Sequence, residues 1–537
     1  MLSILLSVLL NTFVPPVDYD IVLAGNFGEP RPHHFHGGID VKTDGVEGKH
    51  IYAIADGYVS RVTRGLYGFG NAVYVTHPTG QTSVYCHLQR FSPRITRLLR
   101  KWQYRHESSV ADARFTPLDC PVSAGQLIAL SGNTGHSTGP HLHLEVHDTR
   151  TWHMLDPLDF IGSYVSDTVA PRLHGLMAVP LGGVVNGGTS RQTLGVCKEL
   201  NAWGKIGFAI WASDYMQQTY NHFGIRETIL MADGTEVFHS NVEDIPVEHN
   251  LMVNSWGDYD HWLRSHVWYM KSYVEPGNRL AILRTDETHG ILDIQEERDY
   301  QLEYILRDFN ANESHYRFVV HGVRPVSCST STRTADAVAS RQFFRWNRTN
   351  SYSRPGMQLV VPYGLLPSDL TIIPVRHRQP DDYSDVYSFA SHSCPLLGYG
   401  ELYLYPQRHV QDPSKLYIRS NERFVGGDFR NGWVVGRVRD LALKYELAYD
   451  DMPPVVRLVA RGKQLTFSAT DEQSGIASWT ATLDGRFVVF DYQEKSATYT
   501  CDLSTTWLKH GSGQHALCFT VTDNRKNSTS YETTITY

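Results

Sequence analysis

The chain has 537 residues, of which 41% are hydrophobic and 20% are charged. At about 150 residues per domain, this length predicts three or four domains and excludes a single small one. The mean hydropathy is -0.31. Lys and Arg number 49 against 56 Asp and Glu, so the formal net charge is -7. Proteins that track nucleic-acid phosphates need a basic excess, so no nucleic-acid partner is expected.

The N-terminal segment carries an apolar run from Leu2 to Leu10, about half the length needed to cross a bilayer. This run and the polar break after it predict a signal peptide over residues 1–16. Export to the periplasm or cell envelope follows, with no transmembrane helix in the mature chain. The alternative is a hydrophobic N-terminal strand or a membrane tether. Seven cysteines are too few for a disulfide scaffold; Cys501 and Cys518 either pair or remain free thiols.

Residues 17–166 are expected to form an antiparallel β-domain, because short β-rich runs alternate there with Gly-rich turns. A helix interrupts the pattern within an inserted segment, residues 92–122. Ser92 is a plausible N-cap and Pro93 the first helical residue. Apolar residues then recur at helical spacing, so one face of the helix should pack on the domain: Ile95, Leu98, Leu99 and Trp102.

The rest of the chain is β-patterned, with Asp-Gly and Asn-Gly turns. It predicts immunoglobulin-like β-sandwiches at 167–322 and 453–537, with a β-rich module at 323–452 between them. A weak internal repeat supports this division: segment 208–214 resembles 465–471, and 300–312 resembles 515–527. The first copy is longer by about 42 residues, inserted within 239–298. The repeat shows no His, Cys or carboxylate set of metal-site spacing, so residues 170–537 are expected to supply no catalytic group.

Histidine is unevenly distributed: 12 of the 26 lie between residues 17 and 165. In HFHGGID, His36 and Asp40 flank two glycines that favour a tight loop entering a strand. In STGPHLHLEV, His141, His143 and Glu145 would share one face of a strand. Two histidines and a carboxylate with an open fourth position are typical of a catalytic zinc site.

His87 extends this group. In VYCHL, strand alternation would place Tyr85 and His87 on one face and direct Cys86 away from the reaction centre. This pattern argues against a Cys-His peptidase that uses Cys86.

Residues 21–160 resemble the lysostaphin/LytM-type zinc endopeptidases, which cleave peptide bonds in peptidoglycan. The resemblance rests on FGEPRPHHFHGGIDV, ADGYVSRV, GFGNAVYVTHPTG, TSVYCHL, AGQLIALSGNTGHSTGPHLHLEV and DPLDF. It implies that His36, Asp40 and His143 bind Zn²⁺ and that His87 and His141 are catalytic. The implied function is that of an exported zinc metalloendopeptidase acting on peptidoglycan stem peptides or cross-bridges.

The residue types fit this chemistry. No HExxH glutamate is present, so proton transfer and oxyanion stabilisation fall to His87 and His141, and the sequence does not decide which one takes the proton. Glu145 either orients a ligand imidazole or is a surface carboxylate. The basic residues of the predicted helix, among them Arg94 and Arg100, form either a groove wall that attracts anions or an ordinary solvated face.

Two rival functions remain. A catalytically idle envelope protein would use the same groove to bind peptidoglycan or to activate a partner amidase, and a different zinc hydrolase would cut the sugar-peptide link. The complete histidine and aspartate set favours the endopeptidase. The later modules are expected to position the enzyme on peptidoglycan or against other cell-envelope proteins. A chain ending near Ile161 is therefore expected to keep zinc and to cleave soluble muropeptides.

Overall fold

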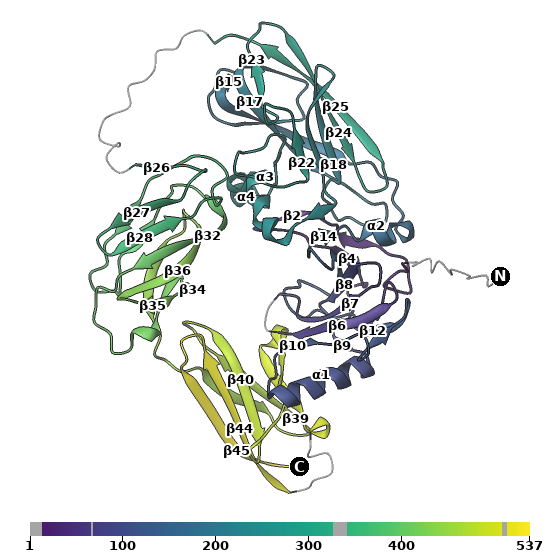
Figure 1. Cartoon of the computed structure of the whole chain (residues 1–537), viewed down its shortest axis with the longest axis vertical. Helices are drawn as coiled ribbons and strands as arrows, with labels where there is room; N and C mark the ends of the chain where they lie inside the picture. Colours follow the sequence, from purple (N-terminus) through teal and green to yellow (C-terminus); the bar gives the residue numbers. More distant parts are fainter. Residues whose placement is uncertain (1–12, 66–67, 326–340, 507–512) are drawn as a thin grey trace, which may run out of the picture.

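A computed structural model describes residues 13–65, 68–325, 341–506 and 513–537. The chain is built mainly of β-strands, as the sequence predicts, and its β-rich parts follow one another around a ring (Figure 1). Most of the predicted signal peptide, residues 1–12, lies outside the described residues. Within the described ranges, no helix is both long enough and apolar enough to cross a membrane.

The N-terminal part is an antiparallel sheet in the order β1-β4-β13-β8-β7-β6-β10, with a smaller sheet β5-β12-β9 beside it. Its elements are β1 (Leu23–Gly25), β2 (Pro30–Arg31), β3 (His34–Phe35), β4 (Ile39–Lys42), β5 (His50–Tyr52), β6 (Gly57–Arg64), β7 (Asn71–Thr76), β8 (Gln81–Cys86), β9 (Arg90–Phe91), β10 (Ala111–Arg114), β11 (Pro121–Val122), β12 (Leu127–Leu130), β13 (His141–Asp148) and β14 (Met154–Leu155). Alternate apolar residues of the central strands, such as Val73, Tyr85 and Leu144, form the core. The opposite face of β13 is left free to carry polar groups.

The predicted helix is α1 (Pro93–His106), and its N-cap is Ser92. Ile95 and Leu99 are buried in the core, and Leu98 and Trp102 pack against it. The helix ends where Glu107 takes a left-handed φ of 47°. Its apolar stripe therefore lies where the 3.6-residue period predicts.

The second part begins after α2 (Leu158–Ile161) and η1 (Gly162–Tyr164), and its main strands form one hydrogen-bonded sheet. The main strands are β15 (Arg172–Val185), β16 (Gln192–Gly195), β17 (Glu199–Ser213), β18 (Glu227–Ala232), β19 (Thr235–Asn241), β22 (Leu283–Thr285), β24 (Asp299–Arg307) and β25 (Glu313–Gly322). Because β17 pairs with β15 and, in parallel, with β25, it joins what would be two separate layers. The continuous sheet surrounds a core that contains Phe208, Leu230 and Phe318. The immunoglobulin-like assignment of this part stays a prediction.

The predicted insertion holds β20 (Asp244–Ile245), η2 (Val247–Met252), α3 (Val253–Trp256), α4 (Tyr259–Ser265), β21 (Met270–Lys271) and β23 (Leu292–Ile294). β20 pairs with β14 and so adds a strand to the N-terminal sheet. Met252, Val253 and Trp256 share a buried cluster with Phe27 and Phe35 of the N-terminal part. The two parts are thus joined by a common apolar core.

Each of the last two parts surrounds its own core: the third has two five-stranded sheets and one two-stranded sheet, and the fourth has two four-stranded sheets. The third part has β26 (Gln342–Phe344), β27 (Asn350–Arg354), β28 (Met357–Val361), β29 (Leu370–Ile372), β30 (Val375–His377), β31 (Val386–Ser388), β32 (Pro395–Leu404), η4 (Pro413–Lys415), β33 (Leu416–Ser420), β34 (Arg423–Gly426), β35 (Asp428–Arg430), β36 (Trp433–Asp440) and β37 (Tyr445–Tyr449). The fourth has β38 (Val455–Ala460), β39 (Gln464–Thr470), β40 (Ile476–Leu483), β41 (Arg486–Phe487), β42 (Asp491–Gln493), η5 (Glu494–Ser496), β43 (Thr498–Asp502), η6 (Leu503–Thr505), β44 (Gln514–Asp523) and β45 (Ser528–Thr536). Cys501 and Cys518 are free thiols, on different sheets.

The fourth part returns to the N-terminal part and closes the ring beside α1 (Figure 1). Asp491 bonds Arg64 at 2.6 Å and Arg100 at 2.5 Å, and Lys495 Nζ donates to the carbonyl oxygen of Ser137 at 2.5 Å. Arg100 therefore fits neither reading of the helix's basic residues, because its guanidinium is an ion-pair partner of the last part of the chain.

The shared apolar core changes the stability expected of a chain that ends near Ile161. A chain ending at Ile161 would expose Phe27, Phe35 and Met154, which are 4%, 1% and 4% exposed in the full chain. Each large apolar side chain contributes roughly 1.5–3 kcal/mol when buried. We therefore expect the short chain to aggregate or to melt at a much lower temperature than a control chain ending at Pro325. Equal melting temperatures for the two chains in a thermal scan would contradict this expectation.

Candidate metal centre

Three predicted site residues converge at the end of β4 and β13. His36 follows β3, and Asp40 lies in β4 directly opposite His143 of β13. His36 Nε2 is 3.0 Å from His143 Nδ1 and 3.1 Å from Asp40 Oδ1, and His143 Nδ1 is 2.8 Å from Asp40 Oδ1. All three residues are at least nine-tenths buried. They form one of the groups in the described residues that could hold a metal ion.

The glycine pair before Asp40 permits this approach. A Cβ on Gly38 would stand 2.1 Å from the carbonyl oxygen of Leu144, and one on Gly37 would stand 2.7 Å from Glu145 Oε1. Real Cβ atoms do not approach other atoms so closely, so the loop between His36 and Asp40 can lie against β13 only because both residues are glycine.

The hydrogen bonds of the two histidines show which ring nitrogen is available to a metal. His36 Nδ1 donates to the carbonyl oxygen of Asn26 at 2.6 Å, and His143 Nε2 donates to Glu145 Oε1 at 3.0 Å. His36 Nε2 and His143 Nδ1 are left to present lone pairs to each other and to Asp40. Three such atoms repel one another unless a cation lies between them. Two neutral imidazoles and one carboxylate form the donor set of a catalytic zinc site.

In the metal-free chain a proton takes this position. Burial lowers the pKa of His36 to about 4. Burial also lowers the pKa of His143, but its hydrogen bonds to Asp40 and Glu145 outweigh burial and raise that pKa to about 9. Metal binding therefore competes with a proton at His143.

Arg31 also contacts the centre, and the sequence did not single it out. Its Nη2 donates to Asp40 Oδ2 at 2.9 Å. This contact occupies one carboxylate oxygen and leaves Oδ1 for the two histidines. No periodicity marks Arg31, because it lies on β2 and reaches Asp40 only through the folding of the loop.

Glu145 is buried, with 5% of its surface exposed, so the surface-carboxylate alternative does not describe it. Its two oxygens accept bonds from His143 Nε2 at 3.0 Å and from His147 Nε2 at 2.7 Å. Burial raises its pKa, but these two bonds outweigh burial and lower it to about 2. His147 was missed by the sequence analysis, although it continues the alternation of His141, His143 and Glu145 along β13.

Removing the Glu145 carboxylate should weaken metal binding. We expect Glu145→Ala to bind zinc roughly 10–100-fold more weakly, the usual cost of losing the partner that orients a ligand histidine. Glu145→Gln, which keeps an acceptor oxygen but no charge, should lose less. Competition with a chromophoric chelator measures both affinities, and wild-type affinity in the alanine variant would count against an orienting role.

The two remaining histidines lie beside the convergent group. His87 follows β8 with a left-handed φ of 58°, and its Nδ1 donates to the carbonyl oxygen of Thr134 at 2.8 Å. The Nδ1 atom of His141 lies 2.8 Å from the carbonyl oxygen of Gly139, and its Nε2 is 3.3 Å from Asp40 Oδ1. The ring centroids of His87 and His141 are 4.8 Å apart. Burial, with the nearby His143 and His141, lowers the pKa of His87 to about 3, so its imidazole is neutral.

The expected orientation of Cys86 is wrong. Cys86 pairs across the strands with His143 and clusters with Tyr74, so it lies on the face that carries the centre, whereas Tyr85 is in the core. The left-handed φ of His87 breaks the strand alternation and returns its side chain to the same side. Cys86 remains a poor nucleophile, because burial, with the charges of Glu145 and Asp40, raises its pKa well above the usual value.

A cleft of about 390 Å³ opens onto these residues. Phe69, Tyr74 and Trp152 supply aromatic walls, and Val247 and Asn250 of the second part line one side. Asn250 Oδ1 accepts the backbone N–H of Phe35 at 2.6 Å. The second part thus shapes the cleft, although neither Val247 nor Asn250 is an acid or a base.

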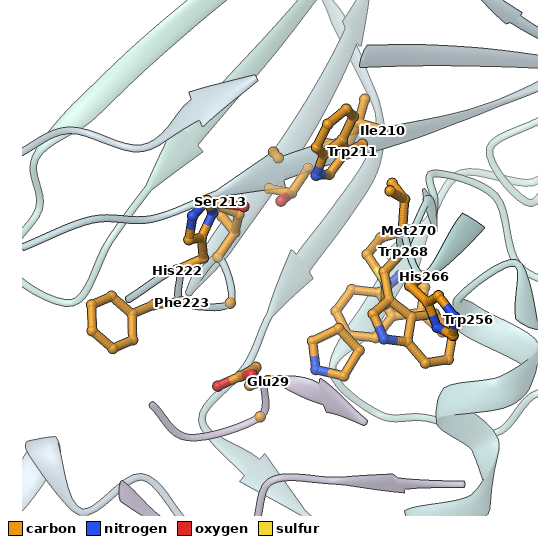
Figure 2. Close-up of a pocket in the computed structure, with 17 residues that line it drawn as sticks. Glu29, Ile210, Trp211, Ser213, His222, Phe223, Trp256, His266, Trp268 and Met270 are labelled. Carbon is orange, nitrogen blue, oxygen red and sulfur yellow. The ribbon is translucent and has the colours of Figure 1, made fainter. Parts of the chain in front are cut away.

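A separate cavity of about 330 Å³ lies between the first two parts, and it shares no lining residue with that cleft. Figure 2 shows Trp211, Trp256 and Trp268 around it, with Glu29 at one side. Burial raises the pKa of Glu29 to about 7. None of the five predicted histidine and aspartate residues lines this cavity, whereas His36, His87 and His143 line the aromatic cleft beside β13.

Comparisons with known proteins show which sequences the chain resembles. Residues 34–98 match the family model of peptidase family M23, and residues 341–450 match that of the Zu5-like domain. The chain is 36% identical over 120 residues to an uncharacterized metalloprotease of Haemophilus influenzae, a match that covers 22% of this chain and 19% of that protein. It is 32% identical over 137 residues to the peptidoglycan DD-endopeptidase ShyA of Vibrio cholerae, covering 24% of this chain and 26% of that protein.

Among solved structures, a zinc-containing peptidase from Vibrio cholerae is 28% identical, with a TM-score of 0.21, and the match covers 27% of this chain and 39% of that one. The chain spans about a fifth to a quarter of the length of the two curated relatives. The matched family segment includes His36, Asp40 and His87. Residues 34–98 of the N-terminal part therefore carry the sequence pattern of peptidase family M23.

Proposed function

We propose that the chain is an exported zinc metalloendopeptidase that hydrolyses peptide bonds in the stem peptides or cross-bridges of peptidoglycan. One observation carries the proposal: His36, Asp40 and His143 converge on one point, and His87 and His141 stand beside it. In this proposal His36, Asp40 and His143 are the zinc ligands, and His87 and His141 are the catalytic residues.

A bound zinc would lower the pKa of a water molecule toward about 7 and polarise the scissile carbonyl group. The chain supplies the rest. Backbone carbonyls hold Nδ1 of His87 and of His141, which leaves Nε2 of each ring for proton transfer or for hydrogen bonding to the developing oxyanion. Arg31 and Glu145 fix the orientation of Asp40 and His143.

The substrate class is supported by the relatives, since the Vibrio cholerae protein is named as a peptidoglycan DD-endopeptidase. The cleft also suits a peptide: it is open and has aromatic walls from Phe69 and Trp152. The predicted signal peptide supports export to the periplasm or envelope. The later parts of the chain would then position the cleft on peptidoglycan or against other envelope proteins.

Digestion of purified sacculi tests the proposal. Zinc-loaded full-length chain should release fragments whose masses, read by mass spectrometry, correspond to a cut peptide bond. A chelator should abolish the release and added zinc should restore it. Release of intact stem peptides would identify an amidase, and no release by zinc-loaded protein would favour the idle envelope protein that binds peptidoglycan or activates a partner amidase.

A further inference from the structure

Three aspartates meet where the N-terminal part joins the second part. Asp214 follows β17, Asp308 follows β24, and Asp167 lies in the connector after η1. One carboxylate oxygen of each lies within 4.8 Å of the other two. The expectation that the repeat carries no carboxylate set of metal-site spacing is therefore wrong. Two members of the set end repeat strands, but the third comes from the connector, which strand comparison does not include.

The surroundings of Asp214 indicate that this group binds a ligand. Its side chain is 7% exposed, and its Oδ1 is buried without a hydrogen-bond partner. A buried carboxylate oxygen without a partner is costly, and native structures usually satisfy one with a protein group, a water or an ion. Asp214 and Asp167 also line a small cavity of about 30 Å³, which is room for one such species.

The cluster lacks a balancing charge. In the ranges that the structure describes, no Lys, Arg or His nitrogen forms an ion pair with Asp167, Asp214 or Asp308. Burial, and then the charges of Asp308 and Asp167, raise the pKa of Asp214 to about 8. Three carboxylates in one buried place are stable only if protons or a cation neutralise them.

The other two carboxylates are held in place for such a cation. Asp308 accepts the backbone N–H of Asn312 at 2.8 Å and its Nδ2 at 2.7 Å. The Asp167 carboxylate accepts the backbone N–H of Val169 at 3.0 Å, and the side chains of Asn310 and Asn312 each donate to the backbone carbonyl oxygen of Asp167 at 3.3 Å. These bonds tie the β24–β25 loop to the connector, so the three carboxylates need little rearrangement to coordinate an ion.

We propose that Asp167, Asp214 and Asp308 bind one Ca²⁺ ion. An all-oxygen carboxylate set selects a hard cation over zinc, which prefers nitrogen and sulfur. Ca²⁺ takes six to eight oxygens in flexible geometry, so backbone oxygens or water would complete its shell. The ion would join the connector to two strand ends of the second part and stiffen the junction between the first two parts.

A second group of three aspartates, in the second repeat copy, explains why we assign the ion to the first group. Asp450, Asp471 and Asp523 form an equivalent group, and Asn527 bonds Asp523 as Asn312 bonds Asp308. The position of Asn310, however, is taken there by Arg525. Burial lowers the pKa of Arg525, while the charges of Asp428, Asp523 and Asp450 oppose that effect. An arginine cation therefore balances part of the charge that the first group leaves unbalanced.

Calcium titration of the zinc-loaded full-length chain tests the proposal, with Mg²⁺ as the comparison ion and melting temperature as a second readout. Wild type should bind one Ca²⁺ per chain and melt at a higher temperature with Ca²⁺ than with EGTA. Asp214→Asn should lose both effects while keeping zinc. Asp471→Asn, the matched change in the second group, should keep both.

One readout separates ion binding from a merely structural carboxylate. In EGTA above about pH 8, where the Asp214 carboxyl is ionised, Asp214→Asn should melt at or above the wild-type temperature, because the amide removes a repulsive charge; a structural role predicts a lower temperature. If Asp214→Asn does not fold, Asp308→Asn and the wild-type titration decide. No saturable binding by wild type up to about 10 mM Ca²⁺, tenfold above the weakest extracellular modules, would overturn the proposal. So would loss of binding in Asp471→Asn alone. Neither readout depends on peptide hydrolysis.

Discussion

Replacing His143 by alanine should strip most of the zinc from the chain and abolish hydrolysis. The change removes one of three proposed ligands and also leaves the buried carboxylate of Glu145 without one of its two histidine partners. The loss of affinity should exceed the roughly 10–100-fold that follows from removing an orienting partner. Metal analysis of the purified variant measures it.

A histidine outside the centre provides the control for this result. His50 is exposed, and its nearest polar partners are Tyr52 and Asp18, so His50→Ala should keep one zinc per chain. If His143→Ala also retained a full equivalent of zinc, the proposed ligand set would be wrong.

Replacing His87 or His141 by alanine should separate chemistry from metal binding. Each variant should keep one zinc yet lose about 10²-fold or more of its hydrolysis rate, because each loses a group that transfers a proton or stabilises the oxyanion. The release rate of muropeptide fragments, measured at matched zinc content, gives the result.

Two outcomes would revise this assignment. Near wild-type turnover in both variants would show that neither histidine is catalytic. Loss of zinc in His141→Ala would instead identify His141 as a zinc ligand. The structure allows this outcome, because His141 Nε2 lies 3.3 Å from Asp40 Oδ1. His87 has no such contact, so His87→Ala is the cleaner test of the catalytic role.

The sequence alone determined the features that depend on local periodicity. Alternation along β13 placed His143 and Glu145 on one face because successive strand residues point to opposite sides. The N-cap at Ser92 and the helical spacing after it located α1. Two glycines between His36 and Asp40 predicted a tight loop, and the structure shows that a Cβ there would meet β13.

Only the tertiary structure decided the contacts between segments far apart in the sequence. The register of β4 against β13 placed Asp40 opposite His143, and distant backbone carbonyls selected the ring nitrogens that His36 and His87 present. The left-handed φ of His87 reversed the expected face of Cys86. These features follow from strand pairing and chain crossings, which residue spacing does not encode.

The same reason explains the ring closure and the aspartate cluster. From the sequence alone, Arg100 is expected on the surface of a helix. The fold places Asp491, 391 residues away in sequence, beside it. The sequence identifies Asp214 and Asp308 only as residues at strand ends, and the fold places Asp167 of the connector next to them. Local pattern reports which face a side chain occupies, whereas the packing of sheets on one another decides which charges share a buried site and must be neutralised there.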